Sequence, residues 1–363
     1  MTMKLITTVF SLAVGFLSYA QYTFNEIEIW SGSFPGTPRY FEEMNGSLFF
    51  QAYNNYNYEL WKSNGTQAGT SLVADMNGTA SSSPHSLKEF NGELFFAATV
   101  SGSGTELWKS DGTSTGTVFL QDIRPGSSSG LESTTTTFNG ERETFFEFSN
   151  ELFFFGNTGN GIELWKTDGT SAGTVSVKNF TQGIVYGNGK YSSNAEREKL
   201  GVIFNNELYF LVVKSSPVPS NFRGELWKTD GTTAGTLLIR DSLHANVNGL
   251  TVANNRIYFS NTTNASGREL WSSDGTDQGT ILVADLDPGA DNSDPEYLTP
   301  FNGALYFKAH GPDGRELYRT DGISTTLVKD IYPGNGSTTA NSGLGLARFF
   351  EYNGLLYLSL IHI

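Results

Sequence analysis

The chain has 363 residues, of which 41 are glycine, 13% are aromatic and only 17% are charged. This composition is poor in strong helix formers and rich in strand and turn residues, so it predicts an all-β protein. The formal net charge of −14 excludes the basic surface that phosphate neutralisation requires, and we expect no nucleic-acid partner. The absence of cysteine excludes disulfides, thiolate metal sites and cysteine nucleophiles.

The first twenty residues predict an export signal. Lys4 precedes an apolar run that ends at Leu17, and the small-x-small cleavage site Ser18–Ala20 follows. The alternatives, a buried strand or a membrane anchor, fit this pattern less well. No later stretch is long and apolar enough to cross a membrane, so we expect no transmembrane segment. A signal peptide at 1–20 would engage the export machinery and place the mature protein at the cell surface or in the medium.

One string of residues recurs six times along the chain. ELWKSNGTQAGTSLVADM begins at Glu59, and close copies of it begin at Glu106, Glu163, Glu225, Glu269 and Glu316. A second signature, of the type NGELFF, precedes each copy and begins a seventh time at Tyr352. The intervals between successive glutamates are 47, 57, 62, 44 and 47 residues, which indicates one basic unit with insertions in two places.

Each unit predicts four strands, here lettered A to D in chain order. An Asn-Gly turn joins A to B, B is the apolar LFF run, C is ELWK, and an Asp-Gly turn leads into D. Repeated four-stranded units are typical of a β-propeller, with a solenoid or a split sandwich as alternatives. We predict a propeller domain at 21–357 with seven blades. The N-terminal strand Asn25–Trp30 would complete the last blade and close the ring.

The last six residues, 358–363, leave the repeat pattern. Their sequence, LSLIHI, resembles one translated frame of a transposon-end sequencing adapter. We interpret them as the non-native tail of a truncated reading frame, and a genuine apolar strand end is the alternative.

The repeated aromatic residue of ELWK is predicted to pack between blades. It is represented by Trp61, Trp108, Trp165, Trp227, Trp271 and Tyr318. A residue that recurs in every blade favours packing over a ligand site. The glutamate two positions earlier shares its strand face, and we expect each carboxylate to accept hydrogen bonds from the backbone of its own D-G-T-x-x-G-T loop. In that loop the Asp is expected to form an Asx-turn and the first glycine to adopt positive φ.

Catalytic signatures are absent from the sequence. Its four histidines are unclustered, and it contains neither H-E-x-x-H nor G-x-S-x-G. We therefore predict no enzymatic activity and no cofactor. The one non-repeating acidic cluster comprises Asp287, Asp291 and Asp294. It could hold Ca²⁺, but its spacing is not that of an EF-hand loop, and a solvated acidic turn is the alternative.

The insertions predict a ligand-binding patch. Residues 131–143, 182–197 and 212–223 lengthen D–A and B–C connections, which emerge at the same end of a blade. The patch would contain Tyr186, Tyr191, Phe222 and Arg223, whose side chains suit stacking on sugars or anchoring a protein. The alternative is that these segments are merely tolerated surface loops.

The repeats resemble those of a family of secreted bacterial proteins with the motif E-L-W-K-[ST]-D-G-T-x-x-G-T, sometimes labelled hyalin-like. The resemblance spans Trp61 to Ile331. It implies a propeller of the kind that Bacteroidetes export by type IX secretion, with no established enzymatic activity. Such proteins usually carry a C-terminal sorting domain, and a truncated gene would explain why none is visible here.

These observations predict an exported binding or adhesion module whose partner is a glycan or a surface protein. A polysaccharide-degrading enzyme on the same scaffold is the first alternative, and it requires non-repeating polar groups that converge on one place. A structural surface-layer component, which would self-associate, is the second.

Overall fold

The computed structural model describes Ile27, Ile29 and residues 36–54, 57–131, 144–180, 201–214, 223–244, 247–330 and 349–358. Within these residues every regular element is a β-strand, which confirms the all-β prediction. No helix suited to crossing a membrane occurs in this part of the chain.

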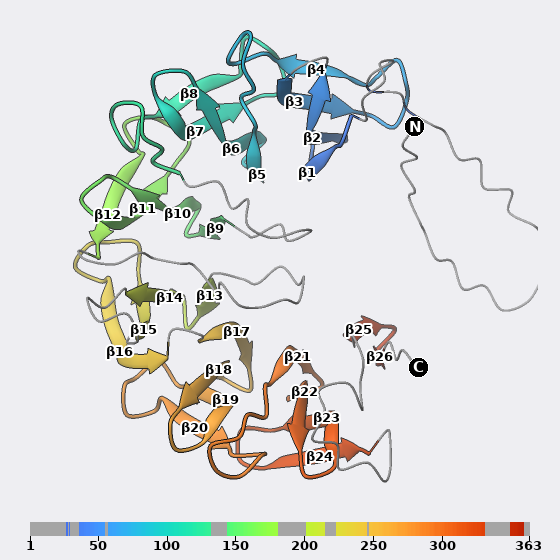
Figure 1. Cartoon of the computed structure of the whole chain (residues 1–363), viewed down its shortest axis with the longest axis vertical. Helices are drawn as coiled ribbons and strands as arrows, with labels where there is room; N and C mark the ends of the chain where they lie inside the picture. Colours follow the sequence, from blue (N-terminus) through green and yellow to red (C-terminus); the bar gives the residue numbers. More distant parts are fainter. Residues whose placement is uncertain are drawn as a thin grey trace, which may run out of the picture. The chain divides into compact units, whose positions relative to one another are not determined.

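Among the described residues, the strands form six sheets of four and one hairpin, and each sheet keeps the order of the chain (Figure 1). The first three sheets are β1 (Arg39–Met44), β2 (Ser47–Asn54), β3 (Asn57–Ser63) and β4 (Ser71–Ala74); β5 (His85–Phe90), β6 (Glu93–Val100), β7 (Gly104–Ser110) and β8 (Val118–Gln121); and β9 (Phe145–Phe148), β10 (Glu151–Asn157), β11 (Ile162–Thr167) and β12 (Val175–Asn179).

The next three sheets are β13 (Gly201–Phe204), β14 (Glu207–Lys214), β15 (Arg223–Thr229) and β16 (Leu237–His244); β17 (Asn248–Ala253), β18 (Arg256–Thr263), β19 (Gly267–Ser273) and β20 (Ile281–Ala284); and β21 (Glu296–Phe301), β22 (Ala304–Gly311), β23 (Gly314–Thr320) and β24 (Thr325–Lys329). The hairpin is β25 (Phe349–Tyr352) and β26 (Leu355–Leu358). We call the sheets first to sixth in this order.

The A–B turns follow the predicted hairpin chemistry. In the first sheet Asn45 and Gly46 have φ values of 52° and 72°, so both central residues are left-handed as a type I′ turn requires. The B and C strands then pair antiparallel, with Phe50 opposite Trp61. The same register places Phe259 opposite Trp271 in the fifth sheet. The repeated signatures therefore predicted the strands and turns of each sheet correctly.

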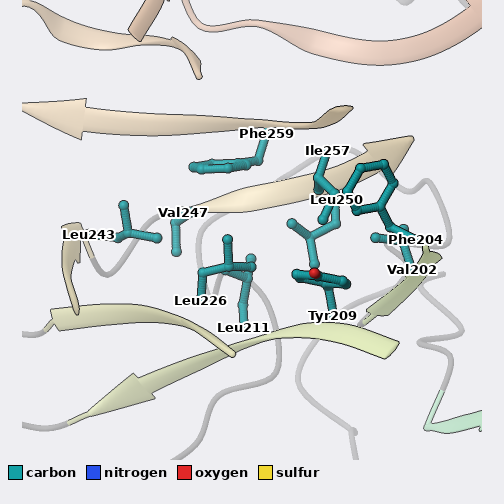
Figure 2. Close-up of a cluster of buried hydrophobic side chains, with 10 residues drawn as sticks. All are labelled: Val202, Phe204, Tyr209, Leu211, Leu226, Leu243, Val247, Leu250, Ile257 and Phe259. Carbon is teal, nitrogen blue, oxygen red and sulfur yellow. The ribbon is translucent and has the colours of Figure 1, made fainter. Parts of the chain in front are cut away.

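Neighbouring sheets pack through opposite faces. In one cluster Phe49 and Leu60 of the first sheet meet Leu94 and Phe96 of the second. In another, shown in Figure 2, side chains of the fourth sheet such as Tyr209 and Leu226 face Ile257 and Phe259 of the fifth. A third cluster joins the fifth and sixth sheets. Burial of each such side chain contributes about 1.5–3 kcal/mol, so stability depends on these interfaces between sheets.

The C–D turn of one sheet covers an aromatic ring on strand B of the sheet before it. Gly275 has a φ of 92°, and a Cβ there would lie 2.5 Å from the hydroxyl oxygen of Tyr209. A Cβ at Gly322 would lie 2.7 Å from the hydroxyl of Tyr258. Both the left-handed backbone and the close approach exclude larger residues at these positions.

Internal contacts divide the chain into two compact units. One comprises 1–137, 151–160 and 165–175, and the other 138–150, 161–164 and 176–363, so the third sheet contributes to both. The prediction of seven blades is not confirmed, because the last described sheet is the two-stranded hairpin β25–β26. Of the predicted closing strand only Ile27 and Ile29 are described, and neither is in a strand. Residues 1–20 and 359–363 lie outside the described residues.

Candidate ligand-binding site

The repeated glutamate holds the connection that leads from strand D to strand A of the next sheet. Glu106 accepts hydrogen bonds at 2.7 Å from the backbone N–H groups of Ile123 and Gly130. Glu59 accepts from the N–H groups of Met76 and Ser82 in the same way. The expectation that each carboxylate bonds its own D-G-T loop is therefore wrong. The glutamate lies near the start of strand C, at the opposite end of that strand from the C–D turn.

Burial changes the acidity of these carboxyl groups. It raises the pKa of both Glu106 and Glu269 to about 7, against the opposing effect of their backbone hydrogen bonds. It also raises the pKa of Glu59. In the first, second and fifth sheets the glutamate has equivalent backbone partners, 17 and 23 or 24 positions downstream, which indicates a structural role for these three carboxyl groups.

The C–D turns of the first five sheets are nearly identical, whereas that of the sixth is shorter and Asp321 Oδ1 accepts from the N–H groups of Ile323 and Ser324. In the second sheet Asp111 Oδ1 accepts hydrogen bonds from Thr113 N (2.8 Å) and Thr113 Oγ1 (2.7 Å), and Thr113 Oγ1 accepts from Gly116 N. The same contacts occur at Asp230. The predicted Asx-turns are confirmed, and the threonine hydrogen bonds lower the pKa of Asp111 and Asp230. Because these polar groups bond to one another, this end of the first five sheets is uniform.

The repeated aromatic residues lie at or beside the interfaces between sheets. Trp108 packs against the cluster shared by the first and second sheets, and Trp271 against the cluster of the fourth and fifth. Tyr318 is buried in the cluster of the fifth and sixth sheets. Trp227 is 8% exposed and packs on Phe180, with ring centroids 5.1 Å apart. Trp61, on β3, and Trp165, which stacks on Phe154, are partly buried.

The sixth sheet differs from the others by a concentration of polar side chains. We call this set the sixth-sheet polar cluster; its members are Asp287, Asp294, Glu296, Tyr297, Lys308, His310 and Arg315. Arg315 pairs with Asp294 (Nη2–Oδ2 3.2 Å) and with Glu296 (Nη1–Oε2 3.8 Å). Glu296 also pairs with Lys308 at 3.1 Å, and Lys308 Nζ lies 5.5 Å from the centre of the Tyr297 ring.

The remaining pair of the cluster joins His310 and Asp287, with 2.7 Å between Nδ1 and Oδ2. Lys308 is only 5% exposed, whereas the other charged members are partly exposed. The cluster thus presents hydrogen-bond donors and acceptors that are fixed by one another and reached by solvent.

A bulge at the start of strand A aims these side chains. The pairing of β21 with β22 shifts register between Glu296 and Thr299, and Tyr297 within it has a φ of 59°. A bulge re-aims side chains, and a bulky residue in the left-handed region is strained. The same bulge occurs in the first, second and fifth sheets, where Tyr40, Ser86 and Gly249 have positive φ. The backbone device is repeated, but the charged side chains are not.

The sequence analysis named two members of this cluster, as part of an acidic group that could hold Ca²⁺ or form a solvated turn. Asp287 and Asp294 belong to it, but each pairs with a different partner, and Asp291 is exposed. No group of residues suited to holding a metal ion occurs in the described part of the chain. A comparison of the repeats could have identified the missed member Lys308. The pairing registers place it at a strand position that neutral residues hold in other sheets, namely Gln51, Ala97, Leu211 and Ser260.

The predicted patch on the inserted loops falls mostly outside the described residues. Tyr186, Tyr191 and Phe222 are in segments that the structure does not describe. Arg223 is exposed at the start of β15. The patch therefore stays a prediction.

No family model and no curated protein matches the chain. Among solved structures, it is similar to the β-propeller domain of the Trilobed protease from Pyrococcus furiosus, with TM-score 0.38, 12% identity, and coverage of 80% of this chain and 84% of that one. It is also similar to prolyl oligopeptidase B from Galerina marginata, with TM-score 0.42 and 12% identity. This match covers 89% of this chain and 47% of that protein, which is under half of its length. An α-L-arabinofuranosidase from Clostridium thermocellum matches with TM-score 0.29 and 13% identity, over 68% of this chain and 93% of that one.

In the described part of the chain, four antiparallel strands in chain order recur in six sheets, and this repetition defines the class. The chain is an all-β protein built from sheets of the kind that form β-propeller blades.

Proposed function

We propose that the protein is an exported binding or adhesion module whose ligand is a glycan or a surface protein. The observation that supports this proposal is the contrast between the two ends of the sheets. The C–D turns of the first five sheets repeat the same internal hydrogen bonds, whereas the end with the D–A and B–C connections carries the sixth-sheet polar cluster. A single specific site must break the symmetry of a repeat, and this cluster does so.

The enzyme alternative has one supporting observation, the closeness of two carboxylates. Asp294 and Glu296 contact the two terminal nitrogens of Arg315. A glycosidase pair requires one carboxyl group to act as an acid. Ion pairing of both groups with one guanidinium does not supply that acid, so binding is the better proposal.

Export through the leader at 1–20 and a place at the cell surface or in the medium are part of the proposal. The proposal also includes a seven-bladed ring closed by Asn25–Trp30, as the number of repeats predicts. Cysteine pairs introduced between this segment and β26 would test closure by their ability to form a disulfide.

The functional proposal is tested with mature protein, residues 21–363, on an array of glycans and against extracts of surface proteins. Saturable binding of one class supports it. Release of reducing ends from polysaccharides would favour the enzyme, and concentration-dependent self-assembly without ligand binding would favour the surface-layer component.

A further inference from the structure

We propose that the sixth-sheet polar cluster is a binding site for a neutral carbohydrate. This inference rests on the proposed binding function and names the ligand class and the residues that contact it. Its central members are Glu296, Tyr297, Lys308 and Arg315, which come from β21, β22 and β23.

The fold does not require these charges. In the first, second, fourth and fifth sheets the position of Lys308 is occupied by neutral residues, and those sheets form the same strands. Opposite Lys308 stands Glu296, whereas Asn248 stands opposite Ser260 in the fifth sheet. A buried ion pair costs desolvation that neutral residues avoid. A charged network at one repeat only is therefore better explained by a ligand than by stability.

The balance of charge selects a neutral ligand. Three carboxylates face two fixed cations and one imidazole, and each carboxylate contacts at least one of these partners. An anionic ligand would meet the carboxylates and a chain of net charge −14. A cationic ligand would have to displace Arg315 or Lys308 from its carboxylate partner.

Paired donors and acceptors suit adjacent hydroxyl groups. A guanidinium has five N–H donors, and a carboxylate can accept about four hydrogen bonds. Each group therefore keeps capacity beyond its ion pair. A sugar hydroxyl can donate to Asp294 or Glu296 while the next hydroxyl accepts from Arg315, so that no buried polar group loses its partner.

Tyr297 supplies an apolar surface for the sugar ring. Its side chain is partly exposed, and the bulge that holds it has the same left-handed backbone as Gly249 in the fifth sheet. A tyrosine holds the same bulge position in the first sheet, where Tyr40 has a φ of 56°, so the feature that distinguishes Tyr297 is the Lys308 ammonium 5.5 Å from the centre of its ring.

The test uses mature protein on an array that holds neutral, uronate-containing and sulfated oligosaccharides. The variants are Arg315→Ala and Tyr297→Gly. The matched control is Arg240→Ala on β16, which removes an ion pair with Asp277 in the C–D turn of the fifth sheet. We expect binding to neutral oligosaccharides that weakens at least about tenfold in both variants and less than twofold in the control. Tyr297→Gly relieves a strained backbone, so its thermal unfolding temperature should not fall.

Each other outcome has a defined meaning. Binding restricted to anionic glycans, or unchanged affinity in Tyr297→Gly, overturns the site while leaving the binding function. Binding of a protein but of no glycan does the same. Absence of any ligand overturns both the site and the proposed function.

Discussion

The carboxylate of Glu269 contacts Ser293 at two atoms, accepting hydrogen bonds from its backbone N–H at 2.9 Å and from its hydroxyl at 2.5 Å. It also accepts from the N–H of Leu286 at 3.0 Å. The residues that directly follow these two in the chain, Asp287 and Asp294, are the carboxylates that pair with His310 and Arg315. A repeated contact of the fifth sheet thus positions the non-repeating cluster of the sixth.

Replacing Glu269 with alanine should weaken both the fold and the cluster. The change removes one acceptor from three donors, but the N–H and hydroxyl of Ser293 keep the carbonyl oxygen of Arg268 as a second partner. We therefore expect a loss of roughly 1–3 kcal/mol in the free energy of unfolding. Chemical denaturation measures it. The control is Glu163→Ala, since that carboxylate is partly exposed and accepts from the side chains of Ser176 and Asn179. Equal losses in the two variants would contradict the assignment.

Stability should fall as the pH rises toward neutrality. The pKa of Glu106 and Glu269 is raised from 4.5 to about 7 in the folded protein. A raised pKa in the folded state gives stability that is complete below pH 4.5 and is lost as the pH rises through 7. Thermal unfolding of the double variant Glu106→Gln and Glu269→Gln between pH 5 and 8 checks this. The variant should lose less stability than the parent over that range, and parallel curves would show that these groups do not titrate there.

Gly267→Ala should be among the most damaging small substitutions. Gly267 has a φ of 62°, and a Cβ there would lie 1.7 Å from the carbonyl oxygen of Asp291. The D–A connection must move, so we expect a loss of more than about 3 kcal/mol. Gly289→Ala in the same connection is the control, because its φ is 104° but nothing lies within 4 Å of the added Cβ. Circular dichroism on heating should separate the two variants by several degrees.

Trp165→Ala should destabilise the third sheet. The indole stacks on Phe154 with ring centroids 6.4 Å apart, and its Cδ1 and Nε1 approach Gly156. Large aromatic-to-alanine changes cost about 3–5 kcal/mol, and because this side chain is partly buried we expect the lower end of that range. A melting temperature within about 2 °C of the parent would show that the indole does not contribute to the core.

The inserted loop at 182–197 offers a test of the patch predicted from sequence. Replacing it with the short connection 77–84 should abolish ligand binding if Tyr186 and Tyr191 contact the ligand, and should leave thermal unfolding nearly unchanged. Retention of full affinity in the replaced protein would exclude the patch and would leave the sixth-sheet polar cluster as the candidate.

The repeats made the strands and turns predictable, because Asn-Gly and Asp-Gly pairs have a local conformational requirement. The partners of Glu106 and Glu269 were not predictable in the same way. The D-G-T loop is nearer in sequence, but the pairing of strands C and D brings residues 17 and 24 positions downstream to the carboxylate. Contacts that depend on strand pairing need the register, which the repeat pattern alone did not supply.

The polar cluster was partly visible for a related reason. Asp287 and Asp294 are close in sequence, and for this reason they were predicted as part of a possible calcium site. Their partners His310 and Arg315 lie on two further strands, β22 and β23. The sequence does distinguish the sixth repeat, because Lys308 replaces the neutral residues that hold the same strand position in other sheets. That difference can be recognised only when strand positions are compared across sheets.

The glycine of a C–D turn and the aromatic ring that it covers belong to successive sheets, as Gly275 with Tyr209 and Gly322 with Tyr258 show. Gly112 over Phe49 and Gly169 over Phe95 show the same relationship, so such a repeat encodes one ring and one covering glycine. Duplication or deletion of a whole repeat would bring together surfaces that already fit, so the gene can gain or lose sheets without inventing a new interface. An insertion or deletion of a few residues within a strand would instead displace the aromatic ring from the glycine that covers it, and would disrupt the interface.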